Sequence, residues 1–409
     1  MPIETLADVI KGTGDPELPL KEALRPANPA LGVVAASLGL SLVGVYAIDV
    51  AVVADPGARS GLPIATTALK QLIFTMMGLF AAAVVALPHH RIIGRISWAL
   101  MALVLCVLVF LLVPFVPEAL VRPRNGARAW INLGVTDFQP SEVAKVAYVL
   151  VVAHYLRYRK EHRTFRGLLM PGLITFPAVA LITLQPDLGT ASLFVPSLFA
   201  MLVAAGARLR HLTVIVLVAA LAAPAMYPML KPHQKRRFVA MLRQIQGDRT
   251  TADDMNFQSF TAQTVVGAGG VAGNADRRAR ALLRYNRLPE RHNDMIYAVI
   301  VTRTGLLGGL AVLGLYGLWI GSALITAAVC KDPFGRLIVV GLTAFIAIQA
   351  VVNVGMTIGL LPIVGVTLPF VSAGGSSMIT CWVMTGLIYN VGLHRPRPPF
   401  RQSFEFADG

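Results

Sequence analysis

Residues 288–294 (LPERHND) combine the side chains of this chain that are best suited to acid–base chemistry and to binding an anion. They run into the apolar sequence MIYAVI, so Asp294 should lie where an aqueous loop meets the start of a hydrophobic helix. A carboxylate at such a boundary can act as a general base. An aspartate at the start of a helix more often caps free backbone N–H groups, and spacing alone favours this structural interpretation of Asp294.

The elements that must position this stretch are membrane-spanning helices. Of the 409 residues, 56% are hydrophobic and 14% are charged, and apolar runs of about 20 residues recur, which predicts an all-α polytopic membrane protein. About ten transmembrane helices are predicted, at 31–53, 65–87, 92–114, 141–157, 168–185, 187–206, 212–230, 294–328, 337–361 and 369–393.

This order of spans defines the predicted domains. An N-terminal tail occupies residues 1–30, a ten-helix membrane domain occupies 31–393, and a C-terminal tail occupies 394–409. A large loop over 231–293 precedes the eighth helix. Basic residues are dense in the loops 89–95 and 157–166, on the side of both termini. The positive-inside rule therefore predicts cytoplasmic termini and an extracytoplasmic large loop.

The formal net charge of +15 follows this loop pattern, so membrane lipids are expected partners and nucleic acid is not. Two loops on the outer side are also rich in Arg. The loop over 115–139 carries Arg128, and the large loop carries Arg236, Arg237, Arg287 and Arg291. A lipid-linked pyrophosphate would suit the bidentate geometry of Arg. The alternative is a solvated, mobile loop that binds lipid phosphate without specificity.

Several polar residues within the spans need partners in hydrocarbon. Glu142 and Lys145 lie three residues apart on one helical face, where they can form an ion pair that is either structural or catalytic. Asp187 should cap the sixth span. Arg303, about two and a half turns beyond Asp294, should face the bundle interior and pair with a carboxylate or with carbonyl groups. Gln349 and Asn353 share one face of the ninth span.

The last apolar run opens with residues 368–377 (LPFVSAGGSS), in which small residues permit close helix packing. Its last two serines, Ser376 and Ser377, follow a Gly-Gly pair that can also interrupt a helix. The three cysteines are far apart in the sequence and indicate neither a disulfide framework nor a metal site.

Seven motifs in this order resemble the SEDS family of cell-wall polymerases, which includes RodA, FtsW and SpoVE. They are residues 126–134, 139–145, 185–190, 267–270, 288–294, 353–356 and 368–377. The resemblance runs from the first span to the last. It implies a SEDS-type fold of ten helices in the bacterial cytoplasmic (inner) membrane, and an enzyme that joins lipid II disaccharides into glycan strands during cell elongation or division.

The resemblance also implies roles for individual residues and partners. Asp294 matches the catalytic carboxylate of the family, and the predicted substrate-binding residues are Arg128, Glu142, Lys145, Arg236, Arg237, Arg287, Glu290, Arg291, His292, Ser376 and Ser377. The implied partners are lipid II and a class B penicillin-binding protein that acts as a transpeptidase. No metal site or cofactor is predicted, and the need for a divalent cation stays open.

The chain departs from the usual family pattern at Ala129, Asp137, Thr302, Arg303 and Ala373. At Thr302 and Arg303 an acidic pair is usual, so the local charge is reversed. These positions motivate an alternative in which the protein is a non-catalytic homologue that serves as a scaffold for a transpeptidase. A flippase for the lipid-linked precursor is a further alternative, although no paired inverted repeat supports it.

Overall fold

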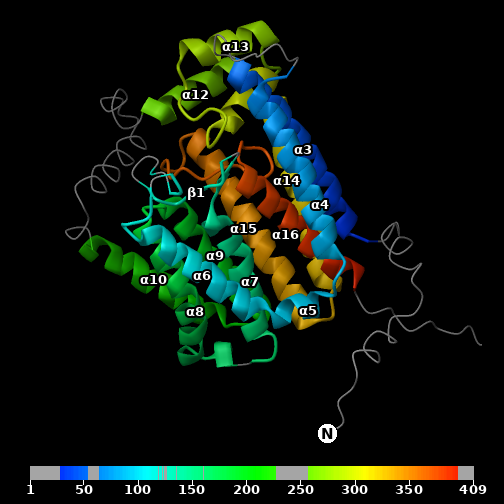
Figure 1. Ribbon diagram of the computed structural model, residues 1–409, viewed down its shortest axis with the longest axis vertical. Coiled ribbons are helices and arrows are strands. Elements are labelled where there is room, and N and C mark those ends of the chain that lie inside the picture. Colours follow the sequence, from blue (N-terminus) through cyan, green and yellow to red (C-terminus); the bar gives the residue numbers. More distant parts are fainter. Residues whose placement is uncertain are drawn as a thin grey trace, which may run out of the picture.

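The computed structural model describes residues 28–53, 64–117, 119–121, 123, 127–134, 136–159, 161–226 and 257–394. These residues form a bundle of helices with one small antiparallel sheet, in which β1 (Ile131–Asn132) pairs with β2 (Asp137–Phe138) (Figure 1). The helices are α3 (Ala30–Val53), α4 (Thr66–Ala86), α5 (His90–Arg95), α6 (Ser97–Leu112), α7 (Pro140–Leu156), η1 (Glu161–Arg163), η2 (Arg166–Leu168), α8 (Leu169–Leu184), α9 (Leu188–Ala205), α10 (Leu209–Met226), α12 (Phe257–Gly269), α13 (Asp276–Tyr285), α14 (Ile296–Val329), α15 (Pro333–Thr357) and α16 (Gly375–Leu393).

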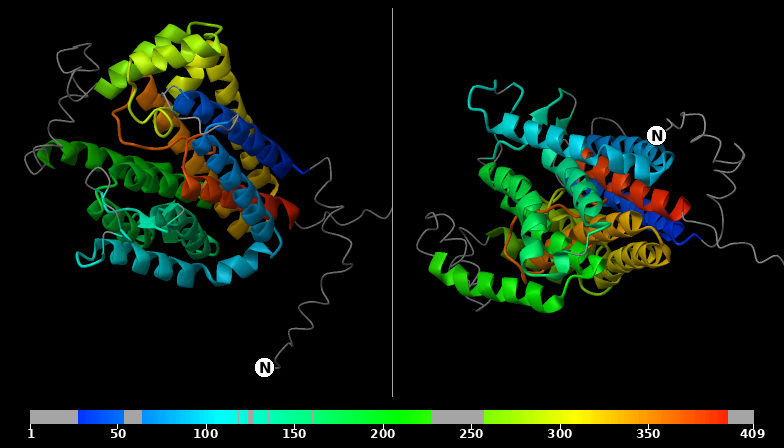
Figure 2. Two further views of the ribbon diagram at one scale, coloured as in Figure 1. Left: turned by 45° about the horizontal axis from the view of Figure 1, so that its top comes forward. Right: turned by 90° about the horizontal axis from the view of Figure 1, so that it is seen from below.

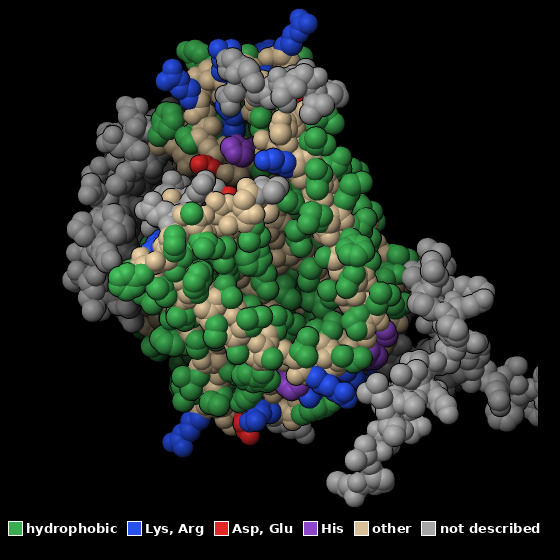
Figure 3. Space-filling model, in the orientation of Figure 1, with side chains coloured by type: hydrophobic (Ala, Val, Ile, Leu, Met, Phe, Trp, Pro, Cys, Tyr) green, Lys and Arg blue, Asp and Glu red, His purple; other side chains and the backbone are tan. Residues whose placement is uncertain are grey.

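Each of the ten predicted spans corresponds to one helix, which confirms the all-α polytopic fold. Seven of the described helices are long and apolar enough to cross a membrane, namely α3, α4, α8 with the preceding turn, α9, α14, α15 and α16. The helices α6 and α10 are shorter and apolar, and α7 matches the remaining predicted span. Figure 3 shows a broad band of hydrophobic side chains between two ends that carry basic side chains.

Two close helix pairs organise the bundle, α3 with α14 and α4 with α16. Glycines allow the backbones to approach, because a Cβ on Gly386 of α16 would lie 2.5 Å from the Ala82 carbonyl oxygen of α4. The helix α15 packs against α7, α9 and α14 near the centre (Figure 2). The start of α3 and the end of α16 meet where a Cβ on Gly392 would contact Ala30, so both described chain ends lie at one face.

The predicted single span over 294–328 is wrong in one respect, because α14 consists of two arms that meet at Gly305. Gly305 has φ 73° and ψ −173°, which is not helical. A Cβ on Gly309 would lie 2.9 Å from the Val301 side chain, whereas these residues would be about 12 Å apart in a straight helix. Residues 296–304, the short arm, therefore fold back against residues 306–329, the long arm.

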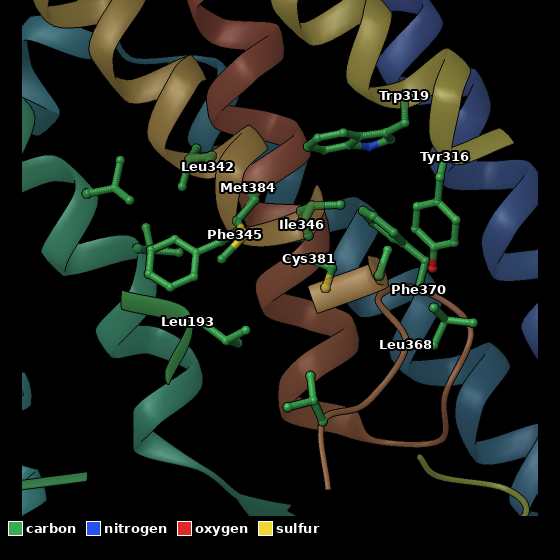
Figure 4. Close-up of a cluster of buried hydrophobic side chains, with 14 of the residues drawn as sticks. Leu193, Tyr316, Trp319, Leu342, Phe345, Ile346, Leu368, Phe370, Cys381 and Met384 are labelled. Carbon is green, nitrogen blue, oxygen red and sulfur yellow. The ribbon is translucent and has the colours of Figure 1, made fainter. Parts of the chain in front are cut away.

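The predicted start of the last span is also wrong, because residues 358–374 form an irregular re-entrant segment and α16 begins only at Gly375. This segment dips into the bundle. Phe370 lies with its ring 6.2 Å from that of Trp319 and 6.1 Å from that of Trp382 (Figure 4). Non-helical backbone at this depth is tolerated only where neighbouring groups satisfy its hydrogen bonds, and the polar residues described below do so.

The described part of the large loop is helical rather than loose. Its helices α12 and α13 cover the end of the bundle at which the short arm of α14 lies. In α13, Ala279 and Leu283 are buried while arginines occupy the opposite face. Residues 231–256 lie outside the described part of the chain.

Candidate active site

Asp294 lies immediately before the short arm of α14 and is 7% exposed. It does not cap the helix as the spacing suggested, since the flanking residue of α14 is Met295 and no side chain caps this end. Its Oδ1 atom is buried without a hydrogen-bond partner among the described residues. Gly365, at φ 72°, faces the carboxylate, and a Cβ there would lie 3.9 Å from Oδ2.

The backbone around Asp294 is held by buried amide and hydroxyl groups. The Nδ2 atom of Asn353 donates to the carbonyl oxygens of Asp294 and Val366, at 2.7 Å each. The hydroxyl of Ser372 donates to the carbonyl oxygen of Asn293 at 2.6 Å. From α4, Gln71 donates to the Ser372 carbonyl oxygen at 2.9 Å. The short arm and the re-entrant segment are therefore fixed to each other and to α4 and α15.

Burial changes the acid strength of the Asp294 carboxyl. Its pKa is raised from 3.8 to about 6, and desolvation by burial is the largest cause; a hydrogen bond from its own backbone N–H opposes this rise, and the neighbouring negative charge of Glu290 adds to it. A carboxylate with a pKa near 6 is mostly ionised at neutral pH, yet it holds a proton more strongly than an exposed aspartate. This combination suits a general base.

Glu142 and Lys145 form the predicted ion pair at 2.8 Å, and both side chains are buried. Lys145 also donates to Gln349 at 3.1 Å. Gln349 in turn donates to the carbonyl oxygen of Thr367 at 3.0 Å. The pair thus connects α7 through α15 to the re-entrant segment that faces Asp294. These contacts give Glu142 and Lys145 a positioning role. As predicted, Gln349 and Asn353 act from one face of α15.

The residues that directly precede Asp294 in the sequence form a cationic hollow. Its volume is about 420 Å³, and its walls are formed by Arg284, Arg287, Leu288, Glu290, Arg291 and His292. Four of the predicted substrate-binding residues therefore share one hollow, joined by Arg284, which was not among them. Arg287 and Glu290 have φ of 48° and 47°, a conformation that is uncommon for residues other than glycine.

Other predicted site residues lie elsewhere. Arg128 is half-buried and donates from Nη2 to the carbonyl oxygen of Val116 in its own loop at 3.2 Å, and its buried Nε has no hydrogen-bond partner among the residues that the structure describes. Ser376 accepts from the Gln139 backbone at 3.0 Å and donates to the Asp137 carbonyl oxygen at 3.0 Å. Ser377 forms a side-chain hydrogen bond with Cys381. Arg236 and Arg237 lie outside the described residues.

Arg303 does not lie deep in the bundle as the straight helix implied, because the fold-back at Gly305 brings it to the α12–α13 connection. Its Nη1 donates to the Asn274 carbonyl oxygen at 2.9 Å, and its Nε lies 3.8 Å from Asp276. It therefore finds the predicted kinds of partner, a carbonyl and a carboxylate. Thr302 donates to the Ala298 carbonyl oxygen at 2.7 Å and lies 3.0 Å from that of Val265, so both altered positions have structural partners.

Asp187 caps α9 as predicted, accepting from the Thr190 backbone at 3.0 Å. Sequence reasoning missed Gln71 and Ser372. A glutamine in the middle of an apolar span was the available signal for Gln71. Among the described residues, no three His, Cys, Asp or Glu side chains are grouped so that they could hold a metal ion.

Comparison with known proteins gives consistent similarities over most of the chain. Residues 30–396 match the model of the FtsW/RodA/SpoVE family, described as "Cell cycle protein". Stage V sporulation protein E from Bacillus subtilis (strain 168) is 32% identical over 326 residues, which cover 79% of this chain and 86% of the relative. Peptidoglycan glycosyltransferase MrdB from Escherichia coli (strain K12) is 32% identical over 320 residues, covering 78% and 84%.

Solved structures are similar as well. A chain in the structure described as "Structural coordination of polymerization and crosslinking by a peptidoglycan synthase complex" aligns with a TM-score of 0.73 and 28% identity, over 88% of this chain and 97% of that chain. The rod shape determining protein RodA from Thermus thermophilus aligns with a TM-score of 0.64 and 27% identity, over 90% and 97%.

Proposed function

Because this chain belongs to the FtsW/RodA/SpoVE family, we propose that it is a peptidoglycan glycosyltransferase that polymerises lipid II into glycan strands, in elongation or division. Relatives named peptidoglycan glycosyltransferase support the activity. The single observation that carries the proposal is the buried Asp294 carboxylate, whose Oδ1 has no hydrogen-bond partner in the described part of the chain and which follows in sequence the residues of the cationic hollow.

Asp294 acts as the general base in this proposal. The hydroxyl of the acceptor sugar attacks C1 of the donor sugar and must lose its proton as the new bond forms. A positioned carboxylate that accepts this proton contributes typically about 10²–10⁴-fold to the rate. The raised pKa of Asp294 strengthens it as a proton acceptor while leaving it largely ionised at neutral pH.

The cationic hollow receives the leaving group. As the bond to C1 breaks, negative charge develops on the lipid-linked pyrophosphate, and preorganised cations stabilise that charge. Arg287 and Arg291 can meet phosphate oxygens with two parallel N–H groups each, and His292 and Glu290 complete the wall. Glu142 and Lys145 support the site from behind through Gln349. A divalent cation, if required, would enter with the pyrophosphate, since Mg²⁺ is bound mainly through phosphate oxygens and water in such sites.

The proposed setting is the cytoplasmic membrane of a bacterium, with both termini in the cytoplasm and the α12–α13 end outside. The basic loops beside α5 and between α7 and α8 support this orientation. A class B penicillin-binding protein is the proposed partner, supported by the similarity to a chain from a peptidoglycan synthase complex.

Extension of labelled lipid II by the purified protein, with and without a candidate transpeptidase, tests the proposal. Wild type should form glycan strands, and Asp294→Ala should form none. The matched control is Glu161→Ala, which removes an exposed carboxylate at the opposite end of the bundle and should keep full activity. Polymerisation by the Asp294→Ala protein would refute the assignment. An inactive wild type that still binds lipid II and the transpeptidase would support a scaffold instead.

A further inference from the structure

An apolar cavity lies between α3 and the two arms of α14. Its volume is about 170 Å³. Val50 of α3, Ile300 of the short arm and Ala311 and Val312 of the long arm contribute to its walls. Among the described residues, the polar side chains that line it are Tyr46, Arg303 and Thr304. Tyr46 is 46% exposed, so the cavity opens sideways toward the lipid.

Arg303, which lines this cavity, belongs to a chain of ion pairs that contains charged side chains of both signs. Arg303 lies 3.8 Å from Asp276, and Arg280 lies 2.9 Å from Asp276 and 3.6 Å from Asp49. Two guanidinium groups and two carboxylates thus balance one another. A neutral rim of mixed sign complements a zwitterionic headgroup better than it complements a purely anionic one.

The size of the cavity restricts its occupant. It holds roughly six water-sized groups of about 30 Å³ each, which is the space of a short run of hydrocarbon chain. A transmembrane helix, about 10–12 Å across with its side chains, is too wide. If the cavity were empty, its apolar walls would lose dispersion contacts. A narrow hydrocarbon chain is therefore the favoured occupant.

We propose that this cavity binds one acyl chain of a zwitterionic phospholipid in the outer leaflet, with its headgroup at the rim formed by Arg303, Asp276, Arg280 and Asp49. The substrate's own lipid fits less well. Arg303 lies nine residues beyond Asp294, which corresponds to about 13 Å along a helix axis, so this rim is separate from the carboxylate at which the sugar of the substrate would react.

Such a lipid would support the catalytic carboxylate from behind. Val299, Ile300, Arg303 and Thr304 all belong to the short arm, whose first turn follows Asp294. A chain packed against these residues fills the wedge between the two arms and holds the short arm against the re-entrant segment. The lipid site is independent of the proposed activity, because binding can be measured without turnover.

Native mass spectrometry of the full-length protein, purified from vesicles of phosphatidylethanolamine and phosphatidylglycerol, tests this inference. Wild type should retain one phosphatidylethanolamine molecule. Ala311→Phe, which adds a ring at an exposed wall position, should reduce retention at least tenfold. The control Leu310→Phe adds a ring on the same helix outside the cavity, at a side chain that is 52% exposed, and should retain the lipid as wild type does.

A second measurement avoids dependence on a variant. Phosphatidylethanolamine with a photoreactive group in its acyl chain should label wild-type peptides that contain residues 43–50 and 299–315. Equal retention by wild type and Ala311→Phe, together with labelling elsewhere, would overturn the proposal. Displacement of the retained lipid by polyprenyl pyrophosphate or by the transmembrane segment of a transpeptidase would also overturn it, because the cavity would then belong to the substrate or to the partner.

Discussion

Replacing Asp294 by Asn should change the pH dependence of the unfolding free energy and, in a separate assay, lower the polymerisation activity. In the folded state burial raises the pKa of the Asp294 carboxyl to about 6, against 3.8 for the ordinary group. Between these two pH values the native carboxyl keeps a proton that the unfolded chain has lost. Proton binding by the native state therefore stabilises the fold below pH 3.8, and this contribution is lost as the pH rises through 6.

The size of the effect follows from the pKa difference. One pH unit corresponds to about 1.4 kcal/mol, so the wild type should lose about 3 kcal/mol of unfolding free energy through this group between acidic and neutral pH. Asn does not titrate. The free energy of unfolding of Asp294→Asn minus that of wild type should therefore rise by about 3 kcal/mol from pH 3.5 to pH 7.5, whatever constant cost the amide adds.

Reversible unfolding in mixed detergent micelles, repeated across this pH range, measures that difference. Glu161→Gln is the control, since it removes a carboxyl that is two-thirds exposed and surface pairs contribute about 0–1 kcal/mol. The Asp294→Asn protein should also lose polymerisation by about 10²-fold or more. Parallel pH profiles for wild type and Asp294→Asn would refute a raised pKa, and with it the reason for regarding this carboxyl as a tuned base.

Four further outcomes are expected. The rate of lipid II polymerisation by wild type should fall as the pH is lowered through about 6, because protonated Asp294 cannot accept a proton; a rate independent of pH between 5 and 8 would contradict this. Arg287→Gln should raise the KM for lipid II about tenfold or more, since a hydrogen bond to a charged group contributes about 1.5–3 kcal/mol, with the steady-state KM as the measurement. Asn353→Leu leaves two buried carbonyl oxygens unpaired and should destabilise the protein by about 2–6 kcal/mol, with kcat falling more than KM changes; unchanged kcat would argue against a positioning role. Lys145→Met should cost about 3–5 kcal/mol by isolating a buried carboxylate, and the double variant Glu142→Gln with Lys145→Met should recover most of that loss in the same unfolding assay.

The sequence predicted the positions of the apolar helices well, because a spanning helix must be hydrophobic over about 20 residues; seven of the described helices meet this requirement. It also predicted that Gln349 and Asn353 would act from one face, since they are four residues apart. Their partners were not predictable, because Asn353 contacts a carbonyl group 59 residues away in the chain. Such contacts depend on the packing of whole helices.

Departures from simple helices escaped prediction for a related reason. Gly305 lies among apolar residues that would suit a continuous helix. Its positive φ suits glycine, and a Cβ at this position would collide with the Val271 carbonyl oxygen of the α12–α13 connection. The helix α13 did leave a signal, since Ala279 and Leu283 are four residues apart on an otherwise charged segment. The candidate site residues are a prediction from the sequence, while the folding back of the short arm beside them became visible only in the structure.

The side-chain amide of Asn353 has a mechanical consequence. Both of its N–H groups are occupied, one by the carbonyl oxygen of Asp294 and the other by that of Val366. One carbonyl belongs to the residue that carries the candidate carboxyl and the other belongs to the re-entrant segment, so one side chain of α15 holds both segments. A small slide or rotation of α15 would therefore move Asp294 and the re-entrant segment together, without any contact between α15 and the substrate.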